Sequence, residues 1–114
     1  MAEVKIYHNP RCSKSRQTLA LLQEQGIDPE IIEYLKTPPD EKTLDTLLKK
    51  LGMEPDDLIR KNEAVYKELG LAQANRAQLL SAMVTNPVLI QRPIVVKGRQ
   101  ARLGRPPEDV LEIV

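Results

Sequence analysis

The chain has 114 residues, of which 41% are apolar and 29% charged, and its formal net charge is +1. This length and balance are typical of one globular domain with a buried core, and a net charge near zero gives no electrostatic reason to expect a nucleic-acid or membrane partner. No apolar run approaches the roughly 20 residues that span a bilayer, and a strand pattern begins too early for a signal peptide. Because the single cysteine cannot form an internal disulfide, the sequence predicts a cytoplasmic protein with a reduced thiol.

The first third of the chain has the pattern of a strand, a helix and a second strand. Residues 4–7 form a short apolar run that ends at Asn9-Pro10, which is typical of a buried strand followed by a turn. Residues 13–25 have helical spacing and stop before Gly26, a residue that favours helix ends. Residues 30–35 are a second strand candidate. The segment therefore has the order and length of a βαβ unit.

The middle of the chain is predicted to be almost entirely helical. From Asp40 onward, leucines recur with the i, i+3, i+4, i+7 spacing of an amphipathic helix, which ends at Gly52. Shorter helices are predicted over residues 55–59 and 64–69, and a longer one over 75–84.

Strand character returns near the end. Residues 94–96 and 101–103 flank Lys97-Gly98-Arg99-Gln100, which indicates a hairpin with glycine in its turn. A last helix is predicted to open at Pro106-Pro107-Glu108, since proline and acidic residues favour a first helical turn. The order β-α-β, helices, β-β-α is that of an α/β, thioredoxin-like fold in a single domain, residues 1–114, with a helical insertion at about 40–85 after the second strand.

Cys12 is the candidate for chemistry. It lies where the first strand is expected to pass into the first helix, between Asn9-Pro10 and the polar, basic run Ser13-Lys14-Ser15-Arg16. Helix N–H groups and nearby cations stabilise a thiolate and make it nucleophilic. The alternative is an inert buried thiol, which this polar setting disfavours.

The spacing around Cys12 limits what the thiol can do. In a Cys-x-x-Cys motif the second thiol resolves a mixed disulfide, but Ser15 occupies that position here. A phosphatase Cys-x5-Arg loop is also excluded, because Thr18 stands where the arginine is required. Any covalent intermediate on Cys12 must therefore be released by water or by a thiol from another molecule.

His8 and three arginines are the other candidate site residues. His8, the only histidine, can act as a hydrogen-bond partner or as a cation near Cys12, or can be a solvated loop residue. One Cys and one His are too few for a zinc site, so no metal is expected. Arg60, Arg92 and Arg105 each stand at an expected element end, where they can together hold an oxyanion. Pro93 stands where a cis peptide bond can bring the chain close to Cys12.

Four segments together resemble the glutaredoxin-linked arsenate reductases. The resemblance is collinear and covers nearly the whole chain, including the helical insertion. Its Cys12–Arg16 run is typical of a shorter, related subgroup. The four segments are residues 8–16, Arg60-Lys61-Asn62, residues 86–96 and Gly104-Arg105-Pro106-Pro107.

The resemblance implies a thioredoxin-like fold and reduction of arsenate to arsenite. By that resemblance Cys12 is the nucleophile that attacks arsenic, while His8 and Ser15 help to form its thiolate. Arg60, Arg92 and Arg105 match the oxyanion-binding arginines. The resemblance implies no bound cofactor: glutathione is a co-substrate that attacks the Cys12–arsenate adduct, and glutaredoxin is the partner that resolves the next mixed disulfide.

Two alternative functions remain open at this point. The Spx-type transcription regulators share the fold, a similar loop and an Arg-Pro-Ile segment, and they act by binding RNA polymerase; the Arg105-Pro106-Pro107 and His8-Asn9-Pro10 segments fit the reductases better. A monothiol thiol-disulfide oxidoreductase that uses Cys12 alone is the second alternative. It requires a glutathione site, which the sequence does not locate.

Overall fold

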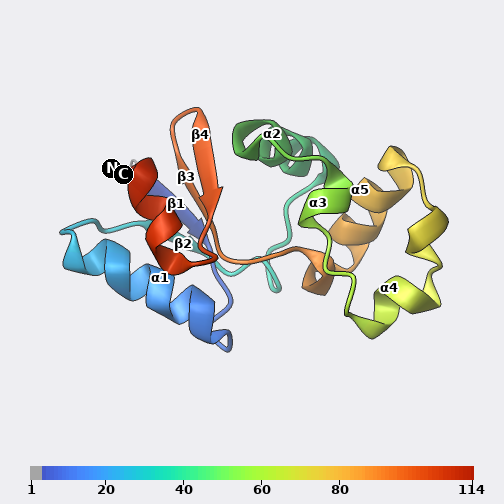
Figure 1. Cartoon of the computed structure of the whole chain (residues 1–114), viewed down its shortest axis with the longest axis horizontal. Helices are drawn as coiled ribbons and strands as arrows, with labels where there is room; N and C mark the ends of the chain where they lie inside the picture. The colour runs from blue at the N-terminus through green and yellow to red at the C-terminus, as the bar shows by residue number, and fades with distance from the viewer. Residues whose placement is uncertain (1–3) are drawn as a thin grey trace. The chain divides into compact units, whose positions relative to one another are not determined.

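The computed structural model describes residues 4–114. Its contacts divide the chain into two compact units, of which the first holds residues 4–37 and 92–114 and the second holds residues 38–91. Figure 1 shows the elements of both units. The second unit contains the predicted helical insertion. The prediction that the whole chain forms one domain stays a prediction.

The first unit is built on a four-stranded sheet with the order β2-β1-β3-β4. The strands are β1 (Val4–Tyr7), β2 (Glu30–Ile32), β3 (Ile94–Lys97) and β4 (Gln100–Leu103). β1 pairs in parallel with β2 and antiparallel with β3, and β3 and β4 form the predicted hairpin. Since β1 and β2 are parallel, the helix between them, α1 (Ser13–Glu24), is the crossover that such a pair requires.

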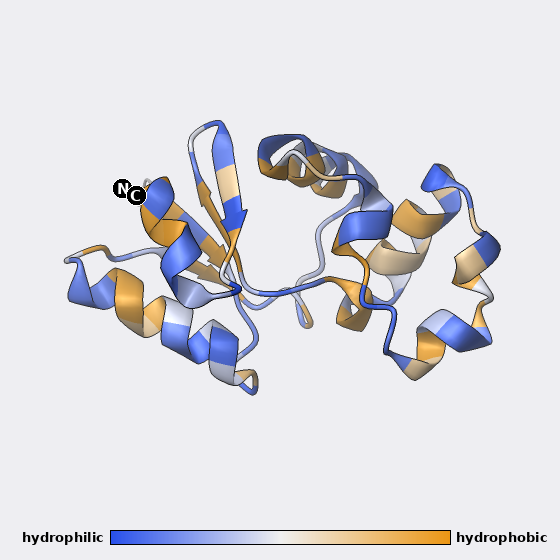
Figure 2. Cartoon of the chain, viewed as in Figure 1, coloured by the Kyte–Doolittle hydropathy of each residue, from blue (hydrophilic) through white to orange (hydrophobic). Residues whose placement is uncertain are grey.

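One face of this sheet is covered by α1 and by the C-terminal 3-10 helix η3 (Pro107–Glu112), which contact each other (Figure 1). The core between them is aliphatic, as expected for a chain without Phe or Trp. In Figure 2 the strands behind β4 carry most of the apolar colour of the sheet, whereas β4 itself is mostly hydrophilic. The buried core residues are Val4, Ile6, Leu22, Val95, Val110 and Ile113.

Two predicted elements differ in the structure. The second strand was expected over residues 30–35 but ends at Ile32, because the last bond to its neighbour is His8 N–H to Ile32 O (2.8 Å) and the neighbouring chain then turns away at Asn9-Pro10. The last helix is a 3-10 helix rather than an α-helix. Its three-residue repeat aligns Val110 and Ile113 on one side, where both are buried.

The second unit consists of α2 (Glu41–Leu51), α3 (Pro55–Leu58), α4 (Ala64–Glu68), η1 (Leu71–Gln73), α5 (Arg76–Thr85) and η2 (Pro87–Leu89). The predicted leucine stripe of α2 is confirmed, because Leu44, Leu47 and Leu48 are buried. Asp40 caps the N-terminus of α2, because its carboxylate accepts the Thr43 N–H, and Gly52 caps the C-terminus with a φ of 70°. α5 packs against both α2 and α3.

We predict that Leu22→Ala destabilises the first unit by about 2–5 kcal/mol, the usual cost of truncating a fully buried leucine. Leu22 is fully buried in the aliphatic core. Chemical denaturation measures the change. Gln23→Ala on the exposed side of the same helix is the control and should change the free energy of unfolding by less than about 0.5 kcal/mol. Equal effects of the two substitutions would contradict the assignment of this core.

Candidate active site

Cys12 is the N-cap residue of α1, at the end of the loop that leaves β1. Asn9 organises this loop: its side-chain oxygen accepts the Arg11 N–H and its carbonyl accepts the Cys12 N–H, both at 3.0 Å. The Arg16 guanidinium, one turn into the helix, donates to Pro10 O at 2.9 Å. The loop is thus fixed by its own polar groups, which hold the thiol at the helix N-terminus as predicted from the sequence.

The surroundings of Cys12 favour the thiolate. Burial alone raises the pKa of the thiol, since only 9% of Cys12 is exposed. The backbone N–H groups of Ser15 and Lys14 and the positive charges of Arg92 and Arg105 act in the opposite direction and bring the pKa below its ordinary value. The thiol makes no cap hydrogen bond of good geometry, so the N–H groups act on the sulfur mainly as partial positive charges.

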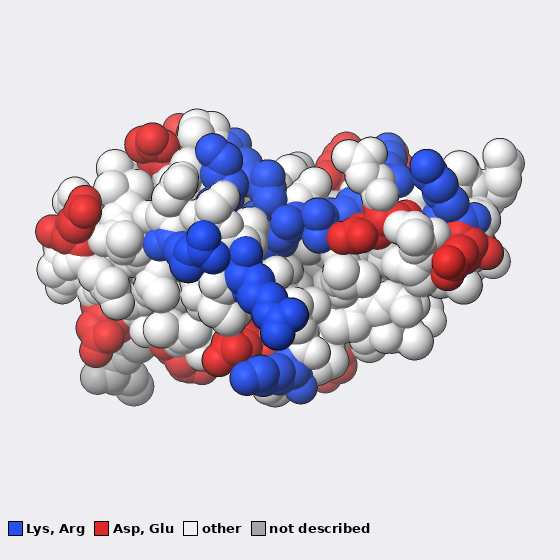
Figure 3. All heavy atoms as spheres, turned by 90° about the horizontal axis from the view of Figure 1, so that it is seen from below, with Lys and Arg blue, Asp and Glu red and all other residues white. Residues whose placement is uncertain are grey.

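Acidic side chains are absent from this part of the sequence. No Asp or Glu occurs from residue 4 to residue 23, whereas Arg11, Lys14 and Arg16 do, and the first turn of α1 has no acidic residue. In the left part of the space-filling view, Lys and Arg side chains lie toward the middle of the picture, and Asp and Glu side chains lie toward its left and lower edges (Figure 3). A thiolate or a bound anion at the start of α1 therefore meets little local repulsion.

Two of the three predicted arginines, Arg92 and Arg105, lie near Cys12. Arg105 Nη2 is 3.9 Å from Cys12 Sγ, and Arg105 Nε donates to the carbonyl of Arg92 at 2.8 Å. The second bond ties the segment before β3 to the segment after β4. Each of these arginines precedes a cis peptide bond, Arg92-Pro93 and Arg105-Pro106. The sequence analysis named Pro93 as a candidate for a cis peptide bond but did not name Pro106.

Arg92 has unused hydrogen-bonding capacity. Its Nε is buried and has no hydrogen-bond partner within residues 4–114. A buried N–H of a guanidinium is costly to leave unpaired. Its position near the thiolate, on which it acts electrostatically, suits a group that pairs with a bound anion.

Gly104 allows the Arg105 segment to approach α1. Its N–H donates to Pro93 O at 3.0 Å. A Cβ at this position would lie 2.8 Å from Pro93 Cγ and closer still to Thr18 Oγ1, and Thr18 is fully buried on α1. Only glycine fits this contact, so Gly104 is a positioning residue for Arg105 that the sequence analysis missed. The signal available in the sequence was a glycine directly before a candidate site arginine.

His8 and Ser15 are in direct contact. His8 Nδ1 and Ser15 Oγ are 2.6 Å apart, and Ser15 Oγ also accepts the Asn9 N–H at 3.0 Å. Burial lowers the pKa of His8 below its ordinary value; the Glu33 charge opposes this and the Arg16 charge adds to it. His8 is therefore mostly neutral at pH 7. Of the two roles considered from the sequence, this favours the hydrogen-bond partner over the cation.

Arg60 belongs to the second unit, so its membership of the site stays a prediction. Within that unit its Nη1 pairs with Glu63 Oε1 at 2.7 Å and lies 3.4 Å from Val88 O. Its N–H donates to Leu89 O at 2.7 Å. Both side-chain contacts involve Nη1, which is one of the three nitrogens of the guanidinium group.

The described residues contain no group of three or more His, Cys, Asp or Glu side chains that could hold a metal ion. None of the helices over residues 4–114 is long and apolar enough to cross a membrane.

We predict that the pH midpoint for alkylation of Cys12 lies below the ordinary cysteine value of about 8.5. The thiolate is the reactive form, and a lowered pKa means that it persists as the pH falls below that value. Arg105→Gln should raise the midpoint, because it removes a positive charge near the sulfur. Iodoacetamide labelling against pH is specific, since Cys12 is the only cysteine. Arg99→Gln in the hairpin turn is the control, and an ordinary midpoint in the wild type would refute the prediction.

We also predict that Gly104→Ala moves the alkylation midpoint in the same direction as Arg105→Gln, because the added methyl group displaces the Arg105 segment. Gly98→Ala is a matched control: Gly98 has a φ of 61° but open space around its Cα. That substitution strains the hairpin turn without affecting Cys12. The same midpoint in Gly104→Ala and wild type would show that Gly104 does not position Arg105.

Known proteins resemble this chain over nearly its whole length. The sequence matches the ArsC family over residues 7–113. It is 46% identical to an arsenate reductase of Neisseria meningitidis, over 96% of this chain and 97% of that one. It is 58% identical to the "uncharacterized protein YfgD" of Escherichia coli, over 98% and 97% of the two chains.

The fold agrees with a solved structure as well. The arsenate reductase from Vibrio cholerae superimposes with a TM-score of 0.95 at 54% identity, covering 97% of each chain. The expected thioredoxin-like fold is thereby confirmed. The match extends over the sheet, the Cys12 loop and the helical unit, and the chain belongs to the ArsC family.

Proposed function

We propose that this protein reduces arsenate to arsenite, with Cys12 as the nucleophile. The observation that carries the proposal is the thiol of lowered pKa beside Arg92 and Arg105. Two guanidinium groups next to a nucleophilic sulfur are suited to a small tetrahedral oxyanion, which they neutralise while the thiolate attacks. The buried, unpaired Nε of Arg92 supports the proposal, because a substrate oxygen would satisfy it.

The first chemical step forms a bond between Cys12 Sγ and arsenic(V). One arsenate oxygen leaves as water after accepting protons, and the product is a Cys12–arsenate thioester. Arg92 and Arg105 bind the remaining oxygens and stabilise their charge. His8 and Ser15 are in hydrogen-bond contact. This pair fixes Ser15, so that the Ser15 N–H stays directed toward the thiolate.

The second step needs an external thiol, because the chain has one cysteine. Glutathione attacks Cys12 Sγ and forms a mixed disulfide, while the electron pair of the sulfur–arsenic bond stays on arsenic. Arsenic(V) is thereby reduced to arsenic(III) and leaves as arsenite. A glutaredoxin thiol then takes the glutathione from Cys12 by thiol-disulfide exchange, which restores the free thiol.

The environment of Ser15 supports the assignment of the second step to an external thiol. It stands in the position of a resolving cysteine, but it is fully buried and bonded to His8 and to the Asn9 N–H. A hydroxyl in that position cannot complete a disulfide. Regeneration by glutathione requires a reducing compartment, so we place the enzyme in the cytoplasm. The relatives named above favour arsenate reduction over polymerase binding or general thiol-disulfide exchange.

We predict that Cys12→Ser abolishes arsenate-dependent NADPH oxidation in the presence of glutathione, glutaredoxin and glutathione reductase. Arg92→Gln and Arg105→Gln should each raise the KM for arsenate roughly 10- to 150-fold, which corresponds to about 1.5–3 kcal/mol for one charged hydrogen bond. Arg60→Gln should raise it as well if Arg60 leaves Glu63 for the substrate.

Lys61→Gln is the control for Arg60, because Lys61 is adjacent and pairs with Asp56 rather than with the proposed substrate. Equal NADPH oxidation by wild type and Cys12→Ser would refute the mechanism. Unchanged KM values in the arginine variants would assign those arginines a structural role only.

A further inference from the structure

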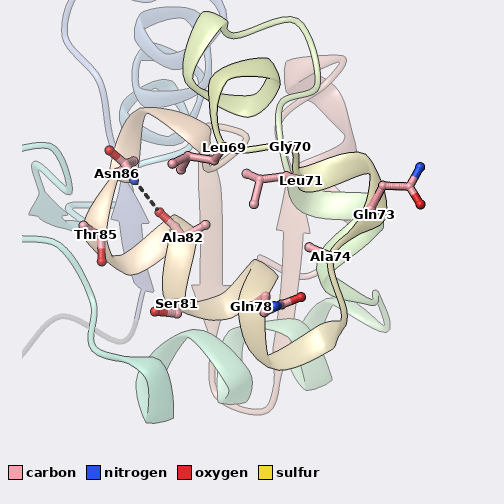
Figure 4. A pocket seen from close by; sticks show the side chains of 10 residues that line it. All are labelled: Leu69, Gly70, Leu71, Gln73, Ala74, Gln78, Ser81, Ala82, Thr85 and Asn86. Carbon is pink, nitrogen blue, oxygen red and sulfur yellow. Dashed lines mark hydrogen bonds between the residues drawn. The ribbon is translucent and has the colours of Figure 1, made fainter.

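Two of the hollows formed by residues 4–114 are candidate ligand sites. The larger, about 560 Å³, lies in the second unit between η1 and α5 (Figure 4). None of its lining residues is charged, and nothing in the structure shows what occupies it. The smaller, about 210 Å³, lies in the first unit and is lined by His8, Asn9, Pro10, Arg11, Glu33, Leu35 and Lys36. We call it the loop pocket.

The loop pocket is built from the Cys12 loop and the turn that follows β2. The two segments are joined where His8 N–H donates to Ile32 O at 2.8 Å. The turn is closed by Lys36 and Thr37 N–H groups, which donate to Glu33 O at 2.9 and 3.0 Å. Because backbone hydrogen bonds hold both walls, the pocket is present without a ligand.

The same loop presents Cys12. Arg11, in the pocket wall, directly precedes Cys12, whose N–H is held by the pocket residue Asn9. A molecule bound in the pocket is therefore anchored beside the segment that carries the reactive sulfur.

The pocket offers charges of both signs. Arg11 makes no side-chain hydrogen bond or ion pair within the described chain, residues 4–114. Lys36 and Glu33 pair at 3.5 Å with exposed side chains, and such pairs are weak and readily exchanged. A ligand with an ammonium and a carboxylate group can thus pair with Glu33 on one side and with Arg11 or Lys36 on the other. Leu35, 42% exposed, gives its methylene groups an apolar contact.

We propose that the loop pocket binds the α-amino-acid end of the small peptide thiol that reduces the Cys12–arsenic adduct. The proposal rests on the proposed function. Pockets for whole drug-sized ligands are usually about 300–1,000 Å³, so this one suits a single amino-acid end rather than a tripeptide. In glutathione, the γ-glutamyl end carries both charges and the thiol belongs to the adjoining residue. Because the thiol lies outside the bound end, it stays free to react at Cys12, which directly follows the pocket residue Arg11.

Binding without chemistry tests the pocket directly. S-methylglutathione has the charges of glutathione but no free thiol. Titrated into the ¹⁵N-labelled protein, it should shift the backbone amide signals of Arg11, Leu35 and Lys36. Arg11→Gln and Glu33→Gln should each weaken its Kd roughly fivefold, the change for one exposed charge pair of about 1 kcal/mol. Lys49→Gln, which breaks a similar exposed pair with Asp45 (3.6 Å) in the second unit, should leave the Kd unchanged.

The kinetics of arsenate reduction give a second test of the loop pocket. In arsenate reduction, the ratio of the KM for glutathione to the KM for the uncharged thiol 2-mercaptoethanol should rise about fivefold in Arg11→Gln and stay constant in Lys49→Gln. A wild type that reduces arsenate with glutathione while S-methylglutathione shifts none of the three pocket signals would overturn the proposal. If the wild type reduces no arsenate, the proposed function fails, and the titration alone decides whether the pocket binds the ligand.

Discussion

The balance of charge around the Cys12 sulfur is the constraint on which the rest of the site depends. Burial opposes ionisation of the thiol, yet its pKa is lowered, so helix N–H groups and two guanidinium groups together outweigh the loss of water. The N–H groups belong to Lys14 and Ser15, which are neighbours of Cys12 in the sequence, but both they and the arginines depend on the fold to face the sulfur. The N–H groups require that α1 begins at Cys12, and the arginines require that the segments flanking β3 and β4 meet the start of α1.

That meeting depends on the small size of Gly104, on its backbone bond to Pro93 and on a bond from the Arg105 side chain. Arg105 Nε binds the Arg92 carbonyl, which couples the two arginines to each other before any substrate arrives. Gly104 leaves the space that Thr18 and Pro93 fill. The Arg105 guanidinium is thus held in place in advance, and a preorganised charge stabilises a developing anion more effectively than one that must be ordered during the reaction.

The sequence predicts the elements of this arrangement better than their contacts. Hydrophobic spacing and the glycine and proline signals locate the strands, α1 and the leucine face of α2, because these patterns depend on local backbone preferences. The basic run after Cys12 indicates a reactive thiol for the same local reason. The contact of Arg105 with Cys12 joins residues 93 positions apart, and no local pattern encodes it. The Gly104 contact and the orientation of Ser15 toward His8 are likewise products of packing, as is the early end of β2, which follows from where its partner strand turns.

Ser15 illustrates how a serine in place of a second cysteine changes the chemistry that a fold can carry out. A second thiol in its position would give the Cys-x-x-Cys spacing in which the second thiol resolves a mixed disulfide. Here the hydroxyl is fully buried, accepts the Asn9 N–H and contacts a mostly neutral His8, so its polar atoms are used to fix the loop. The same residue contributes its own N–H to the thiolate. The side chain thus stabilises the geometry that lowers the pKa of Cys12, while the absence of a second sulfur leaves any covalent intermediate on Cys12 without a thiol of the same chain to release it. A site with a single cysteine needs another molecule to release a covalent intermediate, and this need is the reason for the proposal that the loop pocket binds an external thiol.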